Sequence, residues 1–164
     1  MSKAKSGVNT RRRRLVAPSR TSELYESLLH EYGHAVAAKQ FGGFGYVQIT
    51  ELESPGRPAR QRFTGVFYLT NALDMSAQAR RVVGLAGVVA DFVAILGLAN
   101  LDGNTIYDLS LRVSCLSASD AEMAKGYGPD DVCTTVALVR ERWDEIKEAA
   151  IFDLRHRYRA FARI

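Results

Sequence analysis

The spacing of apolar residues along the chain predicts helices over most of its length. The first expected helix runs from residue 21 to about residue 40, where apolar side chains recur every three or four positions. Thr21 or Ser22 is expected to cap its start, and Gly42-Gly43 follows its end. Acidic residues in the early turns favour this start, because their negative charge interacts favourably with the positive N-terminal end of the helix dipole.

A different pattern follows, in which apolar and polar residues alternate as they do in strands. The two alternating stretches are residues 46–52 and 62–69, separated by a proline- and glycine-containing loop. We therefore expect a mainly α (α+β) fold with a small β-hairpin or sheet. A free strand edge beside the first helix would suit the binding of an extended peptide, although covering the core is an equally good role for such a sheet.

Residues 76–99 predict a second, strongly apolar helix. Its stretch from Val82 to Ala99 spans 18 residues with one charged side chain, Asp91. That length borders on a transmembrane span. The central carboxylate, the three glycines and the flanking Arg80-Arg81 leave both interpretations open. We prefer a buried core helix and expect no membrane-spanning segment.

The second half of the chain predicts further helices, separated by breaks rich in glycine, serine and aspartate. We expect a short helix that ends near Val113 and a second short helix capped by Ser117 or Ser119. After a break at 126–130, a long amphipathic helix should run from Asp130 through Trp143 to about Ala149. A basic segment follows at 155–159.

Charge divides the chain into two regions. The formal net charge is +4, but residues 1–20 carry seven basic groups and no acid, which leaves the remainder with a net charge of −3. We expect residues 1–20 to form a disordered basic arm and residues 21–164 to form one domain. An arm of this kind could also bind nucleic acid or an acidic partner, and this alternative stays open.

Two cysteines, Cys115 and Cys133, are present outside any CxxC pair. Free thiols in a reducing cytoplasm are the simplest interpretation, although a disulfide between them is an alternative. The arm has no apolar run typical of a secretory signal, and no phosphate-binding G-x-x-x-x-G-K-[ST] loop occurs, so we expect no use of ATP.

The motif that carries most of the chemistry is His30-Glu31-Tyr32-Gly33-His34, an H-E-x-x-H sequence on the first helix. Residues four positions apart lie on one face of a helix, so both imidazoles can reach one Zn²⁺ ion. Zinc lowers the pKa of a bound water towards about 7, and Glu31 can then act as the general base. Histidines that only pack or face solvent are the alternative.

Catalytic zinc normally has three protein ligands, so a later acidic residue must supply the third. From the residues alone, Asp91, Asp102, Asp120 and Glu122 are all candidates. Asp91 could instead orient a ligand histidine from the second coordination shell, or cap a helix or pair with an arginine.

Three short motifs resemble the peptidase domain of FtsH-type membrane AAA proteases: the H-E-x-G-H sequence followed by Ala35, the glycine-containing helix at 85–91, and the turn at 117–120. The resemblance spans roughly residues 24–125. It implies a zincin-like helical peptidase domain, with His30, His34 and Asp120 as zinc ligands and Glu31 as the catalytic base. A weaker resemblance, to small peptidases that cleave phage repressors, rests on the H-E-x-G-H sequence alone and would place a glutamate as the third ligand.

The leading hypothesis is therefore a cytoplasmic, ATP-independent zinc metallopeptidase that hydrolyses peptide bonds with a zinc-activated water and Glu31 as general base. Its substrates are expected to be protein segments or peptides that are already unstructured. The alternative is a catalytically inactive, peptidase-like interaction protein, in which the arginine-rich arm at 1–20 binds nucleic acid or an acidic partner.

Overall fold

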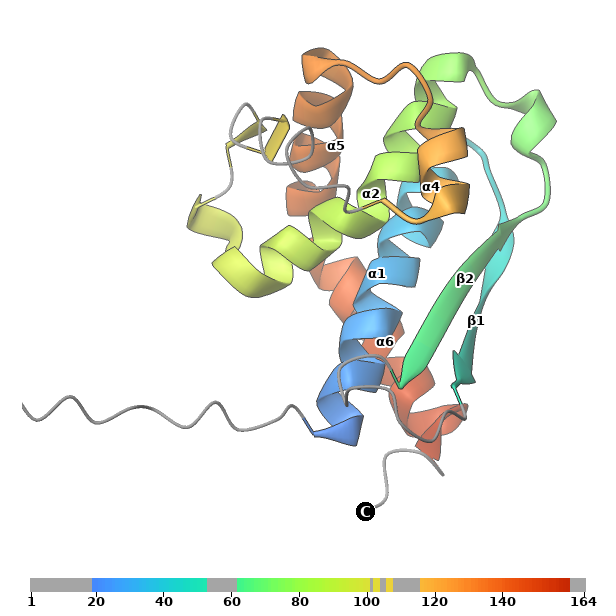
Figure 1. The fold of residues 1–164 in the computed structure, drawn as a ribbon, viewed down its shortest axis with the longest axis vertical. Coiled ribbons are helices and arrows are strands. Elements are labelled where there is room, and N and C mark those ends of the chain that lie inside the picture. Colours follow the sequence, from blue (N-terminus) through green and yellow to red (C-terminus); the bar gives the residue numbers. More distant parts are fainter. Residues whose placement is uncertain (1–18, 53–61, 101, 104–105, 108–115, 160–164) are drawn as a thin grey trace, which may run out of the picture.

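The computed structural model describes residues 19–52, 62–100, 102–103, 106–107 and 116–159. The described chain is mainly helical with one antiparallel pair of strands, which confirms the predicted fold class (Figure 1). Its elements are α1 (Arg20–Gln40), β1 (Gly45–Glu51), β2 (Phe63–Leu69), α2 (Ala77–Leu96), α4 (Ala118–Met123), α5 (Pro129–Glu141) and α6 (Trp143–His156), with short 3-10 turns at Ala72–Asp74 and Leu98–Asn100. The short helix expected before Val113 falls mostly outside the described residues, as does Cys115.

Helix α1 is central and contacts α2, α6 and both strands (Figure 1). Its side chains Leu24 and Leu28 are fully buried, and burial of a leucine contributes roughly 2 kcal/mol to folding. Its cap is Ser19, whose hydroxyl accepts a hydrogen bond from the amide of Ser22 at 3.1 Å. The cap predicted at Thr21 or Ser22 is therefore wrong by a few positions.

Small residues allow α2 to cross α1 closely. A Cβ atom on Gly33 of α1 would lie 2.7 Å from the backbone oxygen of Ala86 on α2, so no larger residue fits this crossing. Ser76 caps α2 as its hydroxyl accepts the amide of Ala79 at 3.1 Å. Most of α2 is buried as far as Val93, as predicted for a core helix. Within the described part of the chain, no helix has the length and apolarity needed to cross a membrane.

The hairpin lies against α1. Strand β1 pairs antiparallel with β2 from Gly45 opposite Leu69 to Glu51 opposite Phe63. The inner face of the hairpin buries Val47 of β1 and Phe63 of β2, while alternate residues point outwards. Both predicted strands are confirmed, and β2 is the strand that lines the cleft described below.

The long C-terminal helix predicted from Asp130 to about Ala149 is in fact two helices. Helix α5 ends at Glu141, Arg142 leaves helical geometry at φ −101° and ψ 12°, and α6 continues to His156. The break has a packing reason, because α5 contacts mainly α2 whereas α6 contacts mainly α1. A straight helix could not follow both partners.

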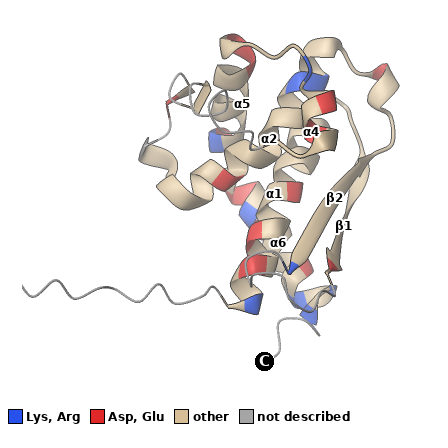
Figure 2. Cartoon of the chain, in the orientation of Figure 1, with Lys and Arg blue, Asp and Glu red and all other residues tan. Residues whose placement is uncertain are grey.

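Charged positions of both signs occur on α1, α2, α5 and α6 (Figure 2). Residues 1–18 of the predicted arm at 1–20 lie outside the described residues. Arg20 belongs instead to α1, and its guanidinium forms an ion pair with Glu51 of β1. Helix α1 thus begins one residue before the predicted start at residue 21.

Candidate metal and catalytic centre

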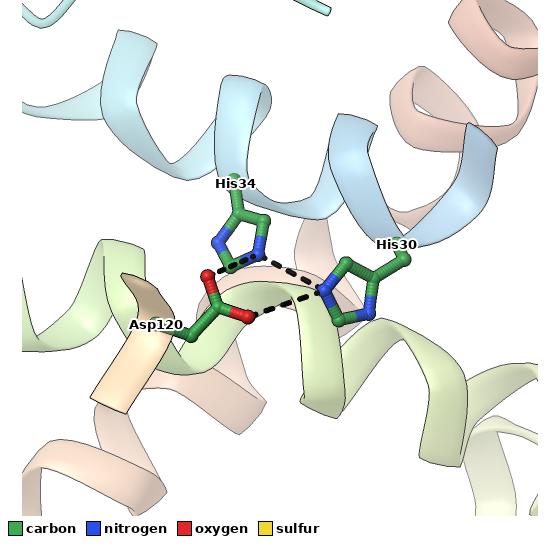
Figure 3. Close-up of side chains that lie close together, drawn as sticks. All are labelled: His30, His34 and Asp120. Carbon is green, nitrogen blue, oxygen red and sulfur yellow. Dashed lines mark hydrogen bonds and ion pairs between the residues drawn. The ribbon is translucent and has the colours of Figure 1, made fainter. Parts of the chain in front are cut away.

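Three side chains from two helices converge beside the α1–α2 crossing (Figure 3). The Nε2 atoms of His30 and His34 on α1 lie 3.2 Å apart. Asp120 at the start of α4 places one carboxylate oxygen 3.5 Å from Nε2 of His30 and the other 3.3 Å from Nε2 of His34. We call these three residues the His-His-Asp cluster.

Each histidine is oriented through its other ring nitrogen. Nδ1 of His30 lies 2.8 Å from a carboxylate oxygen of Asp91, and Nδ1 of His34 lies 2.6 Å from the backbone oxygen of Val83. Both partners are acceptors, so each Nδ1 carries a proton and donates it. Such partners are typical of metal-binding histidines, because they leave the Nε2 lone pair free for the ion.

The spacing of the two imidazoles suits one tetrahedral metal. Two ligands about 2.0–2.1 Å from a tetrahedral zinc lie roughly 3.3 Å apart, and the two Nε2 atoms are 3.2 Å apart. Asp120 approaches each imidazole with a different oxygen, and one ligand atom from each of the three residues lies within 4.8 Å of the others. Gly87 of α2 provides the space beside the histidines. A Cβ atom there would overlap with Nε2 of His34 and lie 2.6 Å from Nε2 of His30.

Asp120 is held in place by the cap of its own helix. The hydroxyl of Ser117 accepts a hydrogen bond from the amide of Asp120 at 3.2 Å and donates one to the Asp120 carboxylate at 2.7 Å. Burial acts to raise the pKa of Asp120, but hydrogen bonding to His30 and the charge of His34 lower it below its ordinary value. The carboxylate is therefore ionised at neutral pH, as a metal ligand must be.

In the absence of metal, the cluster holds one proton in addition to those on the two Nδ1 atoms. Burial acts to lower the pKa of His30, but hydrogen bonds with Asp120 and Asp91 outweigh burial and raise this pKa to about 10. The pKa of the buried His34 is lowered, first by burial and then by the charge of His30. The proton on Nε2 of His30 thus occupies the space between the three ligand atoms.

Glu31 is a buried carboxylate next to the cluster, with 6% of its surface exposed. Burial raises its pKa to about 7, aided by the charge of Asp120 and opposed by His30 and by a hydrogen bond from the backbone of Phe67. Its carboxylate lies directly on β2, where a Cβ atom on Gly65 would lie 2.7 Å from Cδ of Glu31. Strand β2 therefore fixes the position of this side chain.

A cleft of about 570 Å³ opens onto the cluster and onto Glu31. Helix α1 forms one of its walls and β2, from Phe63 to Phe67, forms another; residues of α2 and α4 complete it. Within the described chain, β2 pairs only with β1. The other edge of β2 therefore carries no strand in the described chain.

The other acidic candidates lie elsewhere. Asp102 and Glu122 are exposed and do not belong to the cluster. Asp91 contacts Nδ1 of His30 and is not part of the His-His-Asp cluster. This position is the one expected if Asp91 orients His30 from the second coordination shell. Sequence reasoning missed the roles of Gly65 and Gly87. A glycine inside a strand pattern was the available signal for Gly65, because it indicates a close approach.

A comparison of the chain with models of protein families and with characterised proteins finds no match in either. The resemblance to FtsH-type peptidases therefore stays a prediction that rests on the three motifs.

Proposed function

We propose that the protein is a zinc metallopeptidase that hydrolyses peptide bonds without ATP. The observation that carries this proposal is the His-His-Asp cluster, in which one ligand atom from each residue lies within 4.8 Å of the others, beside the buried carboxylate of Glu31. Among the described residues the cluster contains three ligands and faces a cleft. Three protein ligands with an open position are typical of catalytic zinc, whereas structural zinc usually has four.

His30, His34 and Asp120 would hold the metal, and the mixture of imidazole and carboxylate ligands suits zinc. When bound, zinc polarises a carbonyl group and lowers the pKa of water to about 7. Asp91 and the backbone of Val83 would keep the two imidazoles in the correct tautomer, because both accept a proton from Nδ1.

Glu31 would move the protons of the reaction. As general base it would accept a proton from the attacking water, and it would then donate this proton to the nitrogen of the leaving amine. Its pKa of about 7 suits this exchange at neutral pH, because neither protonation state is strongly favoured. Gly65 and the backbone of Phe67 would keep the carboxylate directed towards the cluster.

Strand β2 supports a peptide as the substrate. An extended peptide can add to a strand edge through main-chain hydrogen bonds, and the edge of β2 lies along the cleft. Such binding needs an unfolded segment or flexible loop, so we expect these rather than stably folded domains to be cleaved. A reducing cytoplasmic setting remains part of the proposal, based on the cysteine content.

The test measures zinc content and cleavage of a peptide library in wild type, Glu31→Gln and His34→Ala. We expect about one zinc per chain in wild type and in Glu31→Gln, and none in His34→Ala. Cleavage should fall by roughly 10²–10⁴-fold in Glu31→Gln, the usual contribution of a general base. Wild-type protein that holds zinc but cleaves no library peptide would contradict the proposal and favour an interaction protein.

A further inference from the structure

The cleft extends beyond the cluster along one face of α1. Glu23, Ser27 and His30 all line it, and their spacing places them on the same side of the helix. Glu26 lines the same end, and Asp91 of α2 and Arg62 beside β2 face it across the cleft. We call Glu23, Glu26 and Asp91 the acidic end of the cleft.

Glu23 is the unusual member of the acidic end. Its side chain is only 8% exposed, and neither carboxylate oxygen has a hydrogen-bond partner. Glu23 forms an ion pair with Nε of Arg62 at 3.6 Å, a distance too long for a hydrogen bond. A buried carboxylate without hydrogen bonds is costly, because burial removes its hydration. A cationic group that entered the cleft could supply the missing bonds.

The other two carboxylates add negative charge, and among the described residues that line the cleft Arg62 is the one basic side chain. The pKa of Glu26 is raised by burial and then by the negative charges of Glu23 and Asp91, so the three carboxylates are close enough to repel one another. Arg62 is 39% exposed, and its long flexible side chain can turn towards solvent. Along the described lining of the cleft, the three carboxylates of the acidic end thus face a single arginine.

We infer that the acidic end of the cleft binds a cationic side chain, lysine or arginine, of the peptide substrate. This inference rests on the proposed peptidase function, because the same cavity joins the acidic end to the His-His-Asp cluster and Glu31. A peptide on β2 would place its cationic side chain beside Glu23 in place of Arg62. Lysine or arginine in the substrate is therefore selected by charge.

The test uses the full chain with Glu31→Gln, loaded with zinc, so that peptides bind without being cleaved. Fluorescence anisotropy compares two labelled peptide sets that are identical except for lysine or norleucine at each position in turn. We expect the lysine peptide to bind roughly tenfold or more tightly at one position, the size of a hydrogen bond between charged groups. This preference should weaken as salt is added.

Two further variants and one control locate the preference. Adding Glu23→Gln or Glu26→Gln should bring the ratio of lysine to norleucine affinity close to one. Adding Glu148→Gln, which removes the same charge from an exposed position on α6 outside the cleft, should leave the ratio unchanged. A preference that is absent, or that survives both Glu23→Gln and Glu26→Gln, would overturn the inference.

The outcome also separates this inference from the proposed function. Wild-type protein that cleaves lysine and norleucine peptides equally well would remain a peptidase without the cationic subsite. Zinc-loaded protein that binds lysine peptides through Glu23 but cleaves none would retain the subsite and contradict the peptidase proposal.

Discussion

Nδ1 of His30 on α1 lies 2.8 Å from the carboxylate of Asp91 on α2, 61 positions along the chain. The bond links the motif helix to the apolar helix and fixes the ring so that Nε2 faces His34 and Asp120. Asp91, the one acidic residue of α2, is thus part of the candidate metal centre.

The first prediction concerns this bond. Asp91→Asn should weaken zinc binding by roughly 10–100-fold, because it removes the charged acceptor of a ligand histidine. Competition with a chromogenic chelator measures the affinity. Asp74→Asn makes the same chemical change at an exposed position and should leave the affinity as it is. Equal affinities in wild type and Asp91→Asn would remove Asp91 from the centre.

The second prediction concerns the space at Gly87. Gly87→Ala should abolish zinc binding, because its methyl group would overlap with the ligand nitrogens of His30 and His34. The helix itself should tolerate alanine, which has the higher helix propensity. Zinc content and circular dichroism test both parts. Gly128→Ala is the matched control, since a Cβ atom there meets nothing within 4 Å.

The third prediction separates activity from metal binding. Gly65→Val should displace the carboxylate of Glu31, which lies against this residue, while leaving the cluster in place. A displacement of about 1 Å can cost 10²-fold in rate, so kcat should fall by about that factor at unchanged zinc content. Zinc loss in Gly65→Val, or undiminished cleavage, would show that β2 does not position the base.

The fourth prediction concerns protons. At pH 8 the metal-free cluster holds one proton on His30, whose pKa is about 10, while the lowered pKa values of His34 and Asp120 leave both of them unprotonated. Zinc must displace this proton, so about one proton per chain should be released on binding. Affinity should therefore rise with pH up to about 10, because less protonated His30 competes with the metal.

Calorimetry in two buffers of different ionisation enthalpy counts the released protons. In Asp91→Asn the count at pH 8 should fall, since His30 loses one of the two carboxylates that raise its pKa. Zinc binding without proton release in wild type would mean that His30 is neutral in the metal-free protein.

Local spacing explains what the sequence could predict. His30 and His34 are four positions apart on one helix, so their common direction follows from helix geometry alone. Asp120 is far away in sequence, and only the family resemblance singled it out from Asp91, Asp102 and Glu122. The structure brings Asp120 to the histidines through the contact of α4 with α2. That metal binds there stays a prediction.

Tertiary packing explains what the sequence did not predict. The apolar pattern from Asp130 to Ala149 is continuous, so nothing local marks the break at Arg142, which arises because α5 and α6 cover different helices. The acidic end was missed for a similar reason. Glu23 and Glu26 look like favourable charges in the first turns of a helix, and only the arrangement of α2 and β2 encloses them.

Helix α1 carries Glu23, both histidines of the His-His-Asp cluster and Glu31 on one continuous helix. Glu23 and His30 are seven residues apart, a rise of about 10 Å, and an extended peptide covers that length with about three residues. A peptidase built in this way would recognise the distance between a positive charge and the bond that it cuts. Moving the lysine along a substrate should then move the cleavage position with it.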